Sequence, residues 1–191
     1  MTDAATGTTT EALVEQLDFH WQGQLRPRLD GLTDAEYFDE PVDGCWSVRP
    51  RGASTAPVQG GSGGMVVEFA FPEPDPAPFT TIAWRLAHLI VGVFAVRNAA
   101  HFGAPPTDYF AFDYATGADQ ALAQLDTEVA TWRAGVTALD DAALWTPVGE
   151  AEPGPYAERP MIDLVLHIHR EVIHHGAEIT LLRDLYAHRR R

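Results

Sequence analysis

The sequence predicts a mainly α-helical protein, a bundle of four long helices with a small β-hairpin inserted between the first two. Three observations lead to this prediction. Long segments repeat apolar side chains with the helical period, and capping residues precede the first two of them, whereas the stretch 40–80 is dense in proline and glycine. No internal repeat or separate linker divides the chain, so residues 1–191 are expected to form one domain.

The first long helix is expected over residues 10–30, after a flexible tail of residues 1–9. Thr8 and Glu11 have the three-residue spacing of a capping box, in which each side chain caps the backbone of the other residue. One helical stripe then carries Leu13, Leu17, His20 and Gln24. The same capping-box spacing recurs in the segment that follows, at Thr33 and Glu36, and predicts a short helix over residues 34–38.

Residues 50–80 form a Pro/Gly-rich insertion. Its residues 65–71 are apolar and β-branched, so they can pair with a strand at residues 42–48 in a hairpin, with the glycine run 60–64 as a flexible loop. A two-stranded ribbon needs a surface to pack on. The nearest surface is the start of the next helix, so the insertion is expected either to wall the mouth of a cavity there or to be a solvated hairpin without a role.

Three more long helices are expected after the insertion, over residues 80–98, 118–139 and 160–188. Thr80 or Thr81 opens the first of them, and Pro160 suits the first turn of the last, where its missing N–H costs nothing. The apolar residues Phe94 and Val96 fall outside the core stripe of their helix and would allow a homodimer.

The composition excludes several classes of partner. The chain has 27 acidic and 13 basic residues and a formal net charge of −14, which repels nucleic acids and anionic membrane surfaces. The longest apolar stretch is broken by Arg85, His88 and Arg97 and is too polar to span a bilayer. The single cysteine, Cys45, is expected to be a buried thiol, and the absence of a visible signal peptide fits a cytoplasmic protein.

The last helix carries the residues that point to chemistry. Glu171 and His175 lie four residues apart on the stripe that also holds Leu164, Ile168 and Leu182. A carboxylate on a core stripe is costly unless it is paired or binds a metal. The residues alone leave two interpretations equally open, a metal site or a structural pair between Glu171 and either His175 or an arginine such as Arg85. The pairs His167–Glu171 and His174–Glu178 have the same spacing but lie toward the edge of the stripe.

A histidine in the second long helix favours the metal site. His88 shares a face with Trp84 and Gly92 among apolar residues, so it is expected to point into the bundle. Alone it would be a core histidine, but beside Glu171 and His175 it becomes a credible candidate for a third ligand. Three protein ligands leave a fourth tetrahedral position open, as in catalytic zinc sites. Among the other histidines, His20 is expected in the core or beside the site, and His101 and His188 in solvent.

Two motifs resemble the DinB-like superfamily of four-helix-bundle metalloproteins. The sequence W-S-V at 46–48, ahead of W-R-L-A-H-L at 84–89, resembles the opening half of a DinB-like domain. The sequence R-E-V-I-H-H-G-A-E-I at 170–179 resembles its last-helix signature. The likeness covers about residues 11–187. It implies one divalent metal in the bundle, held by His88, Glu171 and His175.

The glutamate at position 171 is similar to the mycothiol-dependent maleylpyruvate isomerase branch of that superfamily, whose ligand triad is His, Glu, His. This resemblance implies an enzyme in which Zn²⁺, or alternatively Ni²⁺ or Fe²⁺, activates a low-molecular-weight thiol of the mycothiol type toward a small electrophile. His20 and His174 are the candidates for proton transfer. A metal-dependent hydrolase that uses metal-bound water and a non-catalytic, metal-stabilised bundle are the alternatives.

Overall fold

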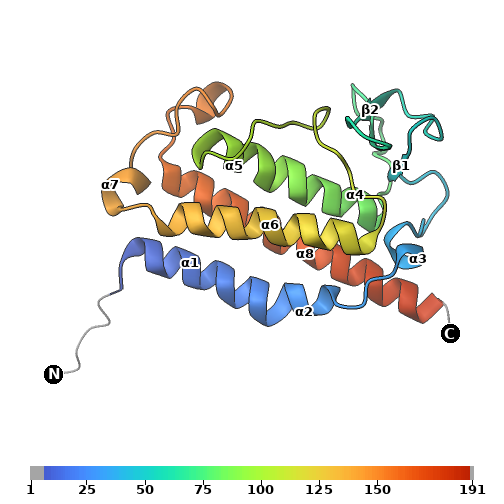
Figure 1. Cartoon of the computed structure of the whole chain (residues 1–191), viewed down its shortest axis with the longest axis horizontal. Coiled ribbons are helices and arrows are strands. Elements are labelled where there is room, and N and C mark those ends of the chain that lie inside the picture. Colours follow the sequence, from blue (N-terminus) through green and yellow to red (C-terminus); the bar gives the residue numbers. More distant parts are fainter. Residues whose placement is uncertain (1–6, 190–191) are drawn as a thin grey trace.

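Four long helices lie side by side in the computed structural model, which describes residues 7–189 (Figure 1). The first comprises α1 (Thr9–His20), the π-helical segment η1 (Trp21–Leu25) and α2 (Arg26–Leu29). The second comprises α4 (Ile82–Ala87), the π-helical segment η2 (His88–Ala95) and α5 (Val96–His101). The third and fourth are α6 (Ala118–Thr137) and α8 (Met161–Arg189). The predicted four-helix bundle is confirmed. Of the expected N-terminal tail, residues 1–6 lie outside the described part.

The predicted capping residues begin the helices as expected. The Thr8 side chain accepts a hydrogen bond from the Glu11 backbone, and the Glu11 carboxylate accepts one from the Thr8 backbone, which completes the capping box. Thr33 caps α3 (Asp34–Tyr37), the predicted short helix. Thr81 caps α4 through the Trp84 backbone N–H. These caps satisfy backbone donors that the first turn of a helix leaves without partners.

The apolar stripes of the four helices meet in one core. The segment Ile82–His101 is long and apolar enough to cross a membrane, but 61% of it is buried inside the bundle, as in the core helix of a soluble protein. Phe94 is fully buried and packs against Trp132 with ring centroids 6.3 Å apart, and Val96 packs against the same core. Phe94 therefore cannot contribute to a dimer face, whereas Val96 is only partly buried, and the homodimer stays a prediction.

The insertion forms a three-stranded antiparallel sheet instead of a two-stranded hairpin. The strands β1 (Val48–Pro50), β2 (Val58–Gly60) and β3 (Met65–Phe69) stand in the order β1-β3-β2, with Val48 opposite Val67 and Gln59 opposite Glu68. Of the strand expected at 42–48 only the last residue belongs to β1. The glycine run is held in place, because the Ser62 backbone and hydroxyl donate to the carbonyls of Phe112 and Ala111.

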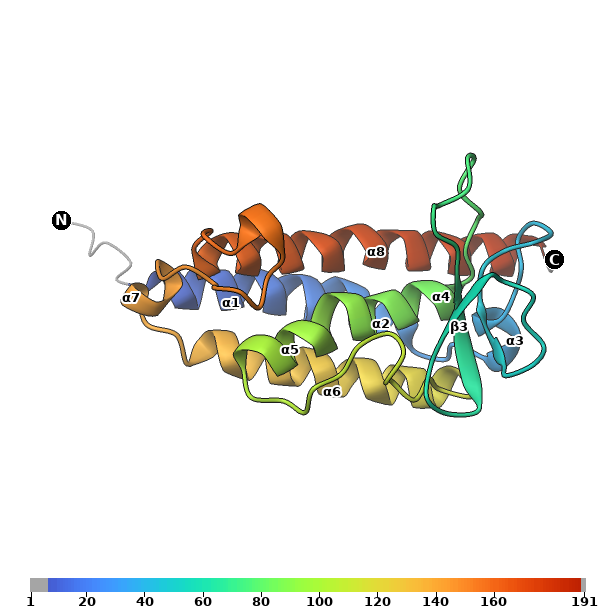
Figure 2. The same cartoon turned by 90° about the horizontal axis from the view of Figure 1, so that it is seen from above.

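The sheet packs on the bundle where α4 begins, as Figure 2 shows. The Trp84 indole donates a hydrogen bond of 2.8 Å to the Glu68 carbonyl, and the Phe69 ring lies edge-on to Trp84 at 6.0 Å and to Tyr109 at 5.1 Å. The insertion is therefore not a solvated hairpin. The connection between α6 and α8 lies at the other end of the bundle and contains two short helices that the sequence did not predict, α7 (Asp141–Leu144) and η3 (Gly154–Tyr156).

Candidate metal centre

The three predicted ligands meet where η2 passes α8. His88, Glu171 and His175 each offer one ligand atom, and these atoms all lie within 4.8 Å of one another. The rings of the two histidines are edge-to-face with centroids 4.7 Å apart, and His175 Nε2 lies 3.3 Å from Glu171 Oε2. His88 is the first residue of η2, and the other two stand one turn apart on α8. The helical stripes thus bring together the trio that the sequence indicates.

His175 is oriented by a neighbouring carboxylate. Its Nδ1 lies 2.7 Å from Glu178 Oε2, and Arg85 forms an ion pair with the same Glu178 oxygen. An ionised carboxylate only accepts hydrogen bonds, so Nδ1 carries the proton and the lone pair is left on Nε2, which is on the side of Glu171. The structural alternative in which Arg85 pairs with Glu171 is wrong, because the partner of Arg85 is Glu178.

His88 is held by two aromatic residues. Its Nδ1 lies 2.7 Å from the Tyr109 hydroxyl, and its ring stacks on Trp84 with centroids 5.6 Å apart. Burial, together with the charges of His175 and Arg85, lowers the pKa of His88 to about 4. The imidazole is therefore neutral at physiological pH, the form that binds a metal, and with Nδ1–H donating to Tyr109 its Nε2 is left free.

Gly92 makes the contact between Tyr109 and His88 possible. A Cβ atom at position 92 would lie 1.9 Å from the Tyr109 hydroxyl oxygen and 3.0 Å from His88 Nδ1. Only glycine leaves room for the phenol there. Sequence reasoning placed Gly92 on the face of His88 but did not find Tyr109, which lies in an irregular loop without any periodic pattern. It also treated Glu178 only as part of a competing pair.

The remaining site candidates are placed less centrally. The Glu171 side chain is 28% exposed and lies 3.6 Å from His167 Nδ1, so it stands at the rim of the core. His174 is exposed, lies 3.5 Å from Glu178 Oε1 and forms a second ligand cluster with His175 and Glu178. His20 belongs to neither cluster. Burial lowers its pKa, and its Nε2 is buried without a partner among the described residues.

Three further side chains, Cys45, His101 and His188, lie outside the ligand clusters. The Cys45 thiol is buried and donates to the Val42 carbonyl at 3.0 Å, and burial raises its pKa, which makes it a poor nucleophile. His101 was expected in solvent, but its side chain is only 6% exposed and its Nε2 lies 3.2 Å from Glu152. His188 is exposed as expected.

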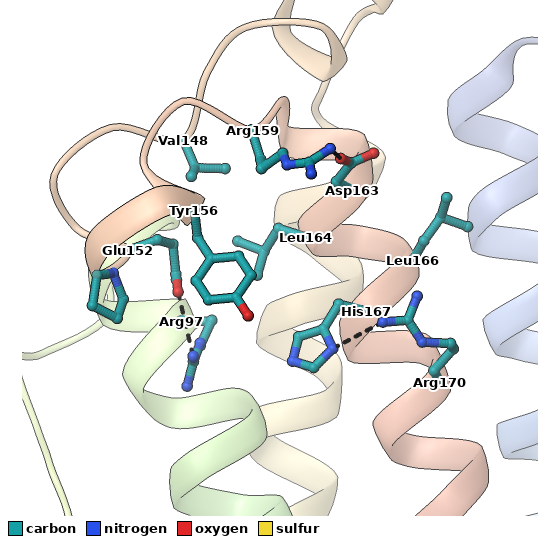
Figure 3. A pocket seen from close by; sticks show the side chains of 11 residues that line it. Arg97, Val148, Glu152, Tyr156, Arg159, Asp163, Leu164, Leu166, His167 and Arg170 are labelled. Atoms are coloured by element: carbon teal, nitrogen blue, oxygen red, sulfur yellow. Dashed lines mark hydrogen bonds and ion pairs between the residues drawn. The ribbon is translucent and has the colours of Figure 1, made fainter.

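A cavity of about 620 Å³ lies along α8, on the N-terminal side of the trio (Figure 3). Its walls come from α5, from the connection before α8 and from the first half of α8, where His167 and Arg170 face it. Because His167 lies 3.6 Å from Glu171, the cavity and the three ligands are neighbours along α8. A volume of this size suits a small organic molecule.

The donor set and its supports fit a divalent cation. Two imidazole nitrogens and a carboxylate oxygen are ligands that Zn²⁺, Ni²⁺ and Fe²⁺ accept, and each histidine has its other nitrogen engaged by a hydrogen bond.

Comparison with known proteins identifies the family. Neither a curated protein nor a solved structure gives a significant match to the chain. The family profile described as the DinB superfamily matches residues 16–179, which span all four helices and the trio. The chain belongs to the DinB superfamily.

Proposed function

We propose that His88, Glu171 and His175 bind one divalent metal ion, Zn²⁺ before Ni²⁺ or Fe²⁺, and that the protein is a thiol-dependent transferase or isomerase. The observation that supports this most is the convergence of three ligand atoms within 4.8 Å, with both histidines oriented by Tyr109 and Glu178. The thiol, of the mycothiol type, is inferred from the likeness of the His, Glu, His triad to the maleylpyruvate isomerase branch. Such a reaction fits a reducing cytoplasm, in which the single Cys45 stays a thiol.

Three protein ligands leave the fourth position of a tetrahedral ion for a small molecule. When bound, the ion lowers the pKa of a thiol at this position and so supplies a thiolate at neutral pH. The chain's own residues orient the ligands and shield them from water. Trp84, which stacks on His88 and is covered by Phe69, keeps water from that side of the histidine.

His174 is the better placed of the two candidates for proton transfer. It is exposed beside the site, with its ring centroid 4.8 Å from that of His175, so it can exchange protons with solvent. The Glu178 carboxylate lies 3.5 Å from its Nε2. His20 belongs to neither ligand cluster of the described residues, which makes it the weaker candidate.

Metal content of the purified protein and its variants tests the ligand assignment. His88→Ala and Glu171→Ala should lose most of the bound metal, whereas His174→Ala should keep it. The opposite pattern, with metal lost from His174→Ala and kept in His88→Ala, would place the ion in the His174–His175–Glu178 cluster and contradict the proposal. Elemental analysis of gel-filtered protein measures all of these variants.

Turnover with and without a thiol tests the activity. The metal-loaded protein should conjugate an electrophile such as 1-chloro-2,4-dinitrobenzene with mycothiol, form the carbon–sulfur bond and release chloride. His174→Ala should slow this reaction while keeping its metal. Turnover of esters or amides that needs metal but no thiol would instead indicate the hydrolase. Full thermal stability after chelation and no turnover in either assay would indicate a non-catalytic bundle.

A further inference from the structure

We propose that the cavity beside the metal centre holds the carboxylate of an organic substrate and that Arg170 is its anchor. This inference rests on the proposed function only in naming that substrate as the electrophile. The cavity is lined by residues of α5, α8 and the connection between α6 and α8, and three of them are arginines, Arg97, Arg159 and Arg170. Glu152 and Asp163 line the cavity as well and pair with Arg97 and Arg159, so Arg170 is the lining arginine that has no carboxylate partner among the described residues.

Arg170 stands apart from the other arginines. Of the eleven arginines that the structure describes, nine form ion pairs with carboxylates, and Arg51 donates to two backbone carbonyls. Within the described residues 7–189, Arg170 contacts neither kind of oxygen. Its guanidinium lies 3.2 Å from His167 Nδ1, a neutral or positive group. A carboxylate or phosphate matches the planar donor fork that Arg170 leaves open.

The charges around the cavity leave room for one negative charge. Arg97 pairs with Glu152 at 3.3 Å, and Arg159 pairs with Asp163 at 3.6 Å. The opposite charges within each of these two pairs cancel, so the net positive charge of the cavity wall comes from Arg170. Arg97 is also short of acceptors, because its Nε–H is buried without a partner among the described residues. One carboxylate fits this balance better than a phosphate, which carries more charge.

The rest of the cavity wall is suited to an apolar body. Val148, Pro153, Leu164 and Leu166 line it together with the ring of Tyr156. Figure 3 shows the Tyr156 ring across the middle of the cavity, with its hydroxyl directed toward the space between Arg97 and His167. A substrate with an aliphatic or aromatic body and one carboxylate would match both the apolar and the charged parts.

The position of the cavity fixes where the acid group stands relative to the reacting atom. The Arg170 guanidinium lies 3.2 Å from His167 Nδ1, and the same Nδ1 lies 3.6 Å from Glu171 Oε1. An acid group on Arg170 would therefore stand next to the metal ligands.

Direct binding tests the inference without any turnover. Phenylacetate, 3-phenylpropionate and hexanoate are titrated into the protein by calorimetry, together with their neutral amides. At least one acid should bind saturably, its amide should bind at least tenfold more weakly, and Arg170→Gln should weaken the acid by about tenfold or more. Arg133→Gln is the control, because Arg133 pairs with Asp18 of α1 and does not line the cavity. It removes the same charge and should change the affinity less than twofold.

Several results would overturn the inference. These are no saturable binding of any of the acids, equal affinity for acid and amide, unchanged affinity in Arg170→Gln, or displacement of the acid by inorganic phosphate at an equal concentration. The metal-free protein and Glu171→Gln separate this inference from the proposed function. Retained binding in both supports the cavity even if metal analysis refutes the ion, whereas binding that disappears with the metal would mean that the acid sits on the ion and not on Arg170.

Discussion

Replacing Gly92 by alanine should weaken metal binding by about tenfold to a hundredfold, the range observed for loss of a group that orients a metal ligand. The added Cβ would stand 1.9 Å from the Tyr109 hydroxyl oxygen and 2.8 Å from Cζ of the same ring. Because the ring carbon is also too close, the whole phenol must retreat, and rotating the hydroxyl is not enough. The 2.7 Å hydrogen bond to His88 Nδ1 is then lost, and nothing fixes the orientation of this imidazole.

The fold should also lose some stability. Loss of the hydrogen bond costs about 1–2 kcal/mol of unfolding free energy, and displacing the packed Tyr109 ring costs about 1–3 kcal/mol more. Replacing glycine by alanine inside a helix returns about 1 kcal/mol. A weakened metal site in a folded but less stable protein is therefore the expected phenotype.

The assays are competition with a chromophoric chelator for the metal Kd and urea unfolding for stability. Gly23→Ala is the matched control, because Gly23 also lies in a π-helical segment and a Cβ there meets nothing within 4 Å. It should leave the Kd unchanged. Tyr109→Phe removes only the hydroxyl and should reproduce the loss of affinity. If both Gly92→Ala and Tyr109→Phe bind metal within twofold of the original protein, the hydroxyl does not orient His88 and the reasoning fails.

Three further predictions concern the surroundings of the site. Glu178→Gln removes the charge that holds His175 Nδ1 and pairs with Arg85, so the metal Kd should rise about tenfold or more. Glu171→Ala, by contrast, should lose the ion itself. Equal metal affinity in Glu178→Gln and the original protein would count against the assignment. Burial lowers the pKa of His169 to about 4, whereas in the unfolded chain this histidine has its ordinary pKa of 6.5. Between these two values the unfolded chain binds a proton that the folded protein does not. The contribution of His169 to stability is therefore fully present above pH 6.5 and is lost as the pH falls toward 4. Between pH 7 and 5 the metal-free protein should lose about 2 kcal/mol through this group, and urea unfolding of His169→Phe should show a smaller loss. Deleting residues 52–63 would remove β2, so Phe69→Ala is the sharper test of the insertion. It should remove the ring that packs on Trp84 and Tyr109 and so alter the preference among electrophiles. Unchanged kinetics across a panel of electrophiles would reject a role for the sheet.

The parts of the structure that follow from local rules could be predicted from the sequence. The capping box at Thr8 and Glu11 marks the start of α1, because both hydrogen bonds lie within four consecutive residues. Glu171 and His175 lie together because helical geometry alone places residues four apart on one face. His88 was the one ligand that needed a second helix, and its apolar neighbours on the helix surface indicated the direction in which it points.

The parts that depend on contacts between distant segments could not be predicted. Tyr109 reaches His88 from a loop whose path is fixed by the sheet, and no spacing in the sequence reports that path. The strand β2 is three residues long and ends in Gly60, where a Cβ would meet the Tyr109 carbonyl at 2.5 Å, so its place depends on packing and not on strand propensity. Glu178 stands at the edge of the stripe between two histidines. Its ion pair with Arg85 from α4 holds it beside His175, and this contact between two helices has no signal in the sequence.

The π-helical segment η2 shifts the phase of the helix that carries it. In a regular α-helix, nine residues at about 100° each would put Arg97 on the side opposite to His88. Hydrogen bonds from residue i to i+5 take more residues per turn, so the angle accumulates more slowly along His88–Ala95. As a result one helix turns His88 toward α8 and also places Arg97 at the cavity that α8 lines. An unbulged version of this helix would present His88 to α8 or Arg97 to the cavity, but not both.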